Sequence, residues 1–199
     1  MYVPKHFIED DVERLATLIG ENGFGAMVTI SEGRPFASHI PFIYDRGRNA
    51  LLGHVARANP QWRHFSGGAE VLVLFQGPHA YISPSWYLSP GVPTWNYAVA
   101  HVYGRAQALE DPSRIRAIVE ALTGKHEHDN KPPWAATYDP RMLNAIVGIE
   151  VAINEIQGKF KLSQNRSAAD RTAVIAKLQA GGAGADLALA KLMAEKSGR

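Results

Sequence analysis

The sequence predicts an α+β fold in which about six strands form a small, closed or partly closed β-barrel with few helices around it. Three observations predict this fold. Apolar residues alternate with a period of two over much of the chain, long connections join the strand-like segments, and the C-terminal residues are rich in Ala and Leu. Closure of the sheet is expected because a barrel leaves no exposed strand edge.

The first half of the chain predicts one helix followed by a three-stranded meander. Asp10 and Asp11 precede an amphipathic run that Asn22 and Gly23 close, so a helix is expected over residues 10–21. The apolar period then changes to that of a strand. Strands are expected at residues 26–30, 36–44 and 50–55, separated by turns at residues 31–33 and 45–47.

The second half predicts more strands, three helix starts and a helical tail. Asn59-Pro60 is typical of a helix start, because asparagine caps free N–H groups and proline fits the first turn. Asp111-Pro112 and Asp139-Pro140 carry the same signal. Strands are expected at residues 71–76, 79–83, 97–109 and 149–153, with a turn at Gly77-Pro78 and the last strand ending near Gly158. Two short helices are expected after residue 168, separated by the glycine-rich residues 181–184.

Length and composition predict one domain, residues 1–166, and a helical extension, residues 167–199, packed on the barrel or on a partner subunit. The chain of 199 residues is 46% hydrophobic, which argues against extended disorder. It contains no cysteine, which excludes disulfides, thiolate catalysis and cysteine-ligated metals. With neither a secretion signal nor an apolar run of membrane-spanning length, a cytoplasmic protein is expected. The net charge of +2 gives little support for nucleic-acid binding.

Residues 53–62, GHVARANPQW, combine a strand end with a helix start and a guanidinium. A helix N-terminus offers free N–H groups, and Arg57 beside it adds a bidentate donor, so the segment suits a phosphate monoester. The simpler interpretation is a capped helix with one solvated arginine.

Two further segments suit a flat or anionic ligand. Residues 77–104 form a proline-braced stretch rich in tryptophan and tyrosine, which could cover a planar ligand while Asn96 binds its edge. Residues 160–166, FKLSQNR, place cations, amides and a hydroxyl after the last strand. An aromatic loop packed on the core and an ordinary polar turn remain the alternatives.

Together these segments resemble the FMN-binding negative transcriptional regulator family, the PaiB-like proteins of the FMN-binding split-barrel superfamily. The strings that carry the resemblance are MYVPKHF, GHVARANPQW, GPHAYISPSWY, VPTWNYAVAHVYG and KLSQNR, in family order. The resemblance implies a six-stranded antiparallel split β-barrel with peripheral helices and a helical C-terminal tail. It also implies a homodimer that binds FMN in a cleft at the subunit interface, with DNA as a partner through the family's regulatory role.

The resemblance also assigns cofactor-binding residues by position. Those expected near the flavin ring are Ser38, His39, Ile40 and Pro41, and those on the phosphate side are His54, Val55, Ala56, Arg57, Asn59 and Trp62. Those expected to close the pocket across the dimer are Trp95, Asn96, Tyr97 and His101, with further donors from Lys161, Ser163, Gln164, Asn165 and Arg166. Arg57 stands where the pyridoxamine-phosphate oxidase relatives carry a lysine, so the chemistry of that oxidase is not carried over.

Two functions follow from the resemblance. The first is a PaiB-like negative transcriptional regulator or flavin sensor, and the second is an FMN-dependent oxidoreductase. A heme-handling split barrel is a weaker third candidate, with His39, His54 or His101 as an axial ligand. His126-Glu127-His128-Asp129 follows a helix and is interpreted as a solvated polar segment, so no metal site is expected.

Overall fold

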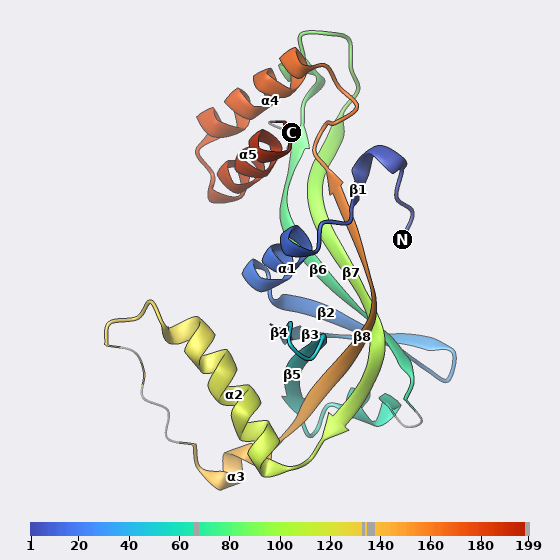
Figure 1. The fold of residues 1–199 in the computed structure, drawn as a ribbon, viewed down its shortest axis with the longest axis vertical. Helices are drawn as coiled ribbons and strands as arrows, with labels where there is room; N and C mark the ends of the chain where they lie inside the picture. The colour runs from blue at the N-terminus through green and yellow to red at the C-terminus, as the bar shows by residue number, and fades with distance from the viewer. Residues whose placement is uncertain (66–67, 133, 135–137, 198–199) are drawn as a thin grey trace. The chain divides into compact units, whose positions relative to one another are not determined.

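The structure is a computed structural model that describes residues 1–65, 68–132, 134 and 138–197. Its strands are β1 Ile8–Glu9, β2 Phe24–Ser31, β3 Arg34–Pro41, β4 Ile43–Asp45, β5 Ala50–Ala56, β6 Glu70–Ile82, β7 Thr94–Leu109 and β8 Ile146–Lys161. Its α-helices are α1 Val12–Glu21, α2 Pro112–Glu127, α3 Pro140–Leu143, α4 Ala168–Gly181 and α5 Gly184–Ser197 (Figure 1). Three short 3-10 helices complete it: η1 Lys5–Phe7, η2 Pro60–Phe65 and η3 Pro84–Trp86. Among the described helices, none is both long and apolar enough to cross a bilayer.

The α+β class and the antiparallel sheet are confirmed, but the strand count is wrong. The strands follow the order β3-β2-β6-β7-β8-β5-β4, and β1 pairs with β8 beside this path. There are eight strands in the described chain, because the two-residue β1 and the three-residue β4 add to the six longer ones. The path ends at β3 and at β4, so the sheet is not closed by strand pairing between the described residues.

Three strand boundaries differ from the predicted ones. The segment predicted as one strand over residues 36–44 is split at Phe42, whose N–H donates to the Gly23 carbonyl. Gly77-Pro78 makes no turn, since β6 runs through it as one 13-residue strand. Gly158 does not end the last strand either. It pairs with Glu9 inside β8, where a Cβ atom would collide with the Glu9 carbonyl and the Leu15 side chain.

The described chain forms two compact units, each containing parts of β6, β7 and β8. The first unit comprises Met1–Leu18, Gln76–Ala100 and Gln157–Arg199, and the second comprises Ile19–Phe75 and His101–Ile156. Whether residues 1–166 form a domain separate from the tail stays a prediction. The two units are described separately below.

The second unit is built on buried strand residues and one amphipathic helix. Met27, Leu51 and Val151 are fully buried, and Phe42 packs edge-on against Phe75 with ring centroids 6.0 Å apart. Helix α2 begins as predicted, because the Asp111 carboxylate caps the Ser113 N–H at 2.8 Å and Pro112 occupies the first turn. Its apolar face packs Ile118 and Leu122 against Leu109, with Ile43 and Leu52 alongside.

The first unit contains the two tail helices, which pack against each other (Figure 1). Ser167 caps α4 by accepting the Asp170 N–H at 3.1 Å, and Gly182 ends it in the left-handed region with φ 68°. Buried residues of both helices, including Val174, Leu178 and Leu189, supply the apolar face of this pair. The predicted break at residues 181–184 therefore lies at the observed helix junction.

Asp170 joins α4 to the segment that follows β6. Its carboxylate accepts the Ser89 hydroxyl at 2.6 Å and the backbone N–H groups of Leu88 at 2.8 Å and Ser89 at 3.1 Å. The Ser89 hydroxyl, followed by these backbone donors, holds the pKa of Asp170 below its ordinary value. A depressed carboxyl pKa stabilises the folded state at pH values above the ordinary pKa, and this contribution is lost as the pH falls through the folded pKa.

Asp170→Asn should therefore lower the free energy of unfolding at pH 7. The difference from the wild type should shrink as the pH falls below about 4, the ordinary pKa of aspartate. Urea unfolding midpoints of the wild type and the variant, measured from pH 7 to pH 3, test this. Asp10→Asn, at an exposed residue of the same unit, is the matched control. A difference in unfolding midpoint between the wild type and Asp170→Asn that stays constant with pH would contradict a stabilising role for the ionised Asp170 carboxylate.

Candidate flavin site

The turn after β5 is fixed by its own polar contacts. The Asn59 N–H donates to the Ala56 carbonyl at 2.9 Å, and the Asn59 side-chain oxygen accepts the Gln61 N–H at 3.0 Å. The Trp62 indole N–H donates back to the Arg57 carbonyl at 3.0 Å. The predicted helix start at Asn59-Pro60 is confirmed as the 3-10 helix η2. Residues 56–62 are thus a rigid corner at the end of β5.

Arg57 is anchored within the second unit. Its Nε donates to the Asn144 carbonyl at 2.8 Å and its Nη2 to the Ile146 carbonyl at 3.2 Å. Its Nη1 pairs with the Glu110 carboxylate at 2.7 Å, and 38% of the arginine side chain is exposed. Three of the five guanidinium N–H donors are therefore engaged in the described part of the chain. One N–H on each terminal nitrogen remains for a ligand.

His54 carries a polar atom that the described chain leaves unsatisfied. Its Nδ1 is shielded from solvent and has no hydrogen-bond partner among residues that the structure describes. Burial lowers the pKa of His54, which favours the neutral imidazole near pH 7. On β5 it stands opposite Gly148 of β8. Because buried polar atoms are nearly always hydrogen-bonded, an unpartnered one needs an explanation such as a ligand or a bound water.

Two of the predicted site segments, residues 38–41 and 54–59, come together in the second unit. The Asn59 amide donates to the Ser38 hydroxyl at 2.8 Å, which ties β3 to the turn after β5. Gly53 permits the close approach, because a Cβ atom there would lie 3.0 Å from the Pro41 carbonyl and 3.1 Å from Ile40. Val55 and Ile40, which the resemblance placed among the cofactor contacts, are buried in the core.

The outward face of β2 and β3 is apolar, and the described residues leave it exposed. Phe24 and Ile30 are 67% and 59% exposed, and the Phe24 ring stacks on His39 at 5.9 Å. The pairing register places Phe24 opposite Pro41 and Ala26 opposite His39, so these residues share one face. A contiguous exposed apolar face of this kind is typical of an interaction surface.

The predicted residues of the first unit are largely engaged with one another. Asn96 is fully buried and donates to the Ser163 hydroxyl at 2.9 Å, and Ser163 itself lies in the left-handed region with φ 63°. The Lys161 ammonium donates to the Trp95 carbonyl at 2.6 Å. Burial, followed by repulsion from Lys159 and Arg166, lowers the pKa of Lys161.

The other predicted residues of this unit hold its surface turns and an aromatic patch. Gln164 accepts the Leu162 N–H at 2.7 Å, while Arg166 lies 4.4 Å over the Tyr87 ring and donates to the Pro90 carbonyl. Asn165 is exposed. Trp95 is 52% exposed beside His79 and Tyr81, and Tyr97 lies under the Lys159 ammonium. His101 belongs to the second unit. The predicted residues thus fall into two groups, one in each unit.

Sequence reasoning missed two residues that shape the site. Gln61 is fully buried, and its amide donates to the carbonyls of Met27 and Phe36 at 2.9 and 3.2 Å. Its Oε1 has no partner in the described part of the chain. Glu110, the carboxylate that pairs with Arg57, lies 53 positions away from it in the chain. Neither residue carries a local signal, since a glutamine in a short helix and a glutamate before a helix are usually solvated.

Comparisons with known proteins agree with this picture. Residues 1–155 match the model of a family described as "Putative FMN-binding domain". The chain is 40% identical to "Protease synthase and sporulation protein PAI 2" of Bacillus subtilis (strain 168), over 90% of this chain and 89% of that protein. It is 30% identical to "Uncharacterized protein AN0679" of Emericella nidulans, over 98% and 97% of the two chains.

Two solved structures share the fold at low sequence identity. The flavocytochrome Anf3 from Azotobacter vinelandii gives a TM-score of 0.65 at 12% identity, covering 80% of this chain and 72% of that one. The FAD and heme binding protein from Mycobacterium smegmatis gives 0.64 at 19% identity, covering 83% and 78%. At such identities the likeness supports the fold alone. The family match and the Bacillus relative go further: the chain belongs to the FMN-binding family, whose cofactor is flavin mononucleotide.

Proposed function

We propose that this protein is a homodimeric, PaiB-like FMN-binding protein that acts as a flavin-dependent negative regulator of transcription. Family membership and the relationship to PAI 2, whose name places that protein in protease synthesis and sporulation, support the proposal. The observation that carries the flavin-binding part of the proposal is the unpartnered Nδ1 of His54, three residues before Arg57, in a segment covered by the family match.

The residues of the second unit fit the chemical needs of FMN. The phosphate needs N–H donors, which the two remaining guanidinium N–H groups of Arg57 and the second N–H of the Asn59 side-chain amide would supply. The ring needs an apolar surface and polar contacts at its edge, which residues 38–41 and the neutral His54 would supply. When bound, FMN supplies hydride and one-electron chemistry. The predicted contacts of the first unit, Trp95 among them, remain part of the proposal.

A second copy of the chain is the partner proposed for the outward face of β2 and β3. Phe24, Ala26 and Ile30 present an apolar row along one strand, and the exposed Phe24 and Ile30 would lose contact with water on pairing. A self-complementary patch of this kind suits a two-fold dimer. The homodimer implied by the family resemblance would thereby cover this face.

An FMN-dependent oxidoreductase is the alternative, and one contact in the tail favours it. Helix α5 has two lysines, Lys191 and Lys196, and Lys196 is bound to the buried Glu9 at 3.0 Å. A helix that reads DNA displays several basic or amide side chains to the groove, so α5 offers little for that purpose. The regulatory proposal therefore does not assign DNA binding to helix α5.

Flavin binding and assembly are tested together on the purified full-length protein. Titration of the flavin-free protein with FMN should quench flavin fluorescence to a stoichiometry of one FMN per chain, and native mass spectrometry should show a dimer. Riboflavin, which lacks the phosphate, should bind at least about 10-fold more weakly than FMN if Arg57 binds the phosphate. Equal affinity for riboflavin and FMN would contradict a phosphate site at Arg57.

The two roles are separated by a second pair of assays on the FMN-loaded protein. Retention of its own promoter DNA in a mobility-shift assay, competed by specific but not random DNA, would support the regulator. Steady-state oxidation of NADH or NADPH with a small electron acceptor, without DNA retention, would support the oxidoreductase and overturn the regulatory role.

A further inference from the structure

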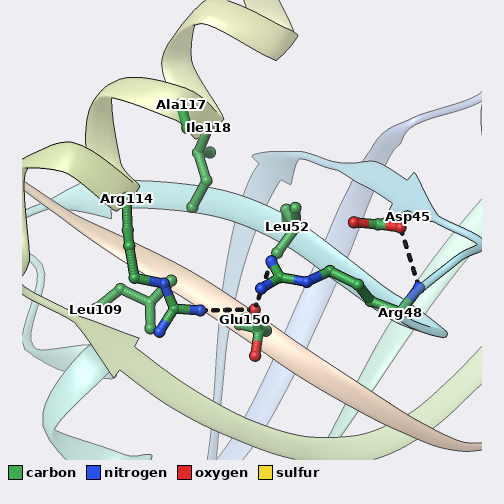
Figure 2. A pocket seen from close by; sticks show the side chains of 8 residues that line it. All are labelled: Asp45, Arg48, Leu52, Leu109, Arg114, Ala117, Ile118 and Glu150. Carbon is green, nitrogen blue, oxygen red and sulfur yellow. Dashed lines mark hydrogen bonds and ion pairs between the residues drawn. The ribbon is translucent and has the colours of Figure 1, made fainter.

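A cleft unrelated to the flavin segments opens between helix α2 and the β4–β5 hairpin (Figure 2). It has a volume of about 300 Å³ and lies entirely in the second unit. The lining residues are Asp45, Arg48, Leu52, Leu109, Arg114, Ala117, Ile118 and Glu150. This volume is at the lower end of the range found for small-molecule sites.

Two guanidinium groups converge on one carboxylate in this cleft (Figure 2). The Glu150 carboxylate is 16% exposed and accepts Arg114 Nη2 at 2.9 Å and Arg48 Nη1 at 3.5 Å on the same oxygen. Its other oxygen accepts the Gln107 amide at 2.7 Å. The Glu150 carboxylate thus accepts three donors, whereas each arginine side chain uses one nitrogen in the described part of the chain.

Each of the two arginines therefore has guanidinium N–H groups without a partner in the described part of the chain. Arg48 and Arg114 are 58% and 39% exposed, and the 3.5 Å contact of Arg48 is at the long limit for a hydrogen bond. Asp45 also lines the cleft, but its Oδ1 accepts the Arg48 backbone N–H at 3.1 Å within the hairpin turn. Two arginines and two carboxylates line the cleft, so a ligand carboxylate would bind through the unused guanidinium N–H groups and not through an excess of positive charge.

The floor of the cleft is apolar. Leu109 and Ile118 are buried in the core cluster under α2, and Leu52 packs against the same cluster. Ala117 on the neighbouring helical position leaves room above them, because its side chain is a single methyl group. Unused guanidinium N–H donors over an aliphatic floor suit an amphipathic molecule with one anionic end.

We propose that this cleft binds a small organic monocarboxylate, with its carboxylate between Arg48 and Arg114 and its aliphatic body on Leu52, Leu109 and Ile118. Binding would exchange the long Arg48–Glu150 contact for a charge-assisted contact to the ligand and leave the shorter Arg114–Glu150 pair in place. A dianion is disfavoured, because it would add a second negative charge beside Glu150 and Asp45.

Hexanoate is the probe, with hexylammonium and inorganic phosphate as comparisons, and isothermal titration of the full-length protein is the measurement. We expect saturable hexanoate binding in the millimolar range or tighter, no binding of hexylammonium and no competition by phosphate. Arg48→Gln, in an exposed turn, and Arg114→Gln should each weaken hexanoate binding at least about 10-fold. Arg116→Gln, on the same helix but paired with Glu120 away from the cleft, should leave it unchanged.

Circular dichroism of each variant establishes that it is folded before titration. Absence of saturable hexanoate binding to the wild type would overturn the proposal, as would equal binding of hexylammonium. Unchanged affinity in a folded Arg48→Gln variant would overturn it too. The flavin titrations described above use different residues, so failure of this site and failure of the flavin site are distinguishable.

Discussion

Replacing Arg57 with glutamine is expected to weaken FMN binding about 10- to 100-fold, equivalent to roughly 1.5–3 kcal/mol for a charge-assisted contact to phosphate. The guanidinium is already oriented by the carbonyls of Asn144 and Ile146 and by Glu110, so it would meet the phosphate with little loss of side-chain freedom. Fluorescence titration with FMN measures the loss. Arg116→Gln is the matched control, because Arg116 lies in the same unit and pairs with Glu120 on helix α2.

Glu110→Gln separates a phosphate contact from a purely structural role for Arg57. Removing the carboxylate frees one guanidinium nitrogen that now pairs with Glu110 at 2.7 Å. If phosphate binds at Arg57, the carboxylate competes with it, and the variant should bind FMN more tightly than the wild type. If Arg57 merely fastens β5 to residues 144–146, both variants should lower Tm and neither should change the FMN affinity after correction for folded protein.

The sequence predicted most helices because their signals are local. The Asp111-Pro112 start of α2, the helix over residues 10–21 and the glycine break between α4 and α5 all coincide with observed elements. In each case a side chain or a glycine satisfies the helix end within a few residues. Such signals do not depend on the packing of distant parts of the chain.

The strand boundaries were harder to predict because pairing partners far along the chain decide them. Gly77-Pro78 reads as a turn locally, yet β6 continues through it as a strand. Gly158 reads as a strand end, but it is a glycine because the Glu9 carbonyl approaches it across the β1–β8 pair. Glycine inside a strand often marks such a close approach of another backbone. Neither feature is visible without the partner strand.

In the candidate site, too, local sequence signals located residues, whereas long-range packing decided their contacts. The family resemblance located residues 54–59 by their sequence string and residues 38–41 by their position on the second strand, and the fold brings the two together through the Asn59–Ser38 hydrogen bond. The family strings also pointed to Asn96 and Ser163, which lie buried and bound to each other in the first unit. Their role as cofactor contacts stays a prediction. Burial and pairing depend on long-range packing, so residue type alone could not separate them from exposed donors.

Glu9→Gln is expected to lower the free energy of unfolding by roughly 2–4 kcal/mol, near the range for breaking a buried ion pair by removing one partner. Glu9 is 3% exposed, and its Oε2 accepts Arg14 at 3.1 Å and Lys196 at 3.0 Å. The neutral amide would leave two cations facing each other without an anion. Because Lys196 lies in the last turn of α5, this carboxylate also fastens the C-terminal helix to the N-terminal strand of the first unit.

Urea unfolding measures the loss, with Glu195→Gln as the matched control, since Glu195 is an exposed carboxylate on the same helix as Lys196. Lys196→Met removes one of the two cations, so adding Glu9→Gln to it should cost less than adding Glu9→Gln to the wild type. The difference is the coupling energy of the pair, and about 1 kcal/mol or more is expected for residues in direct contact. A Glu9→Gln variant as stable as Glu195→Gln would mean that the triad contributes nothing beyond packing, and that apolar burial and the Asp170 hydrogen bonds hold the tail helices in place.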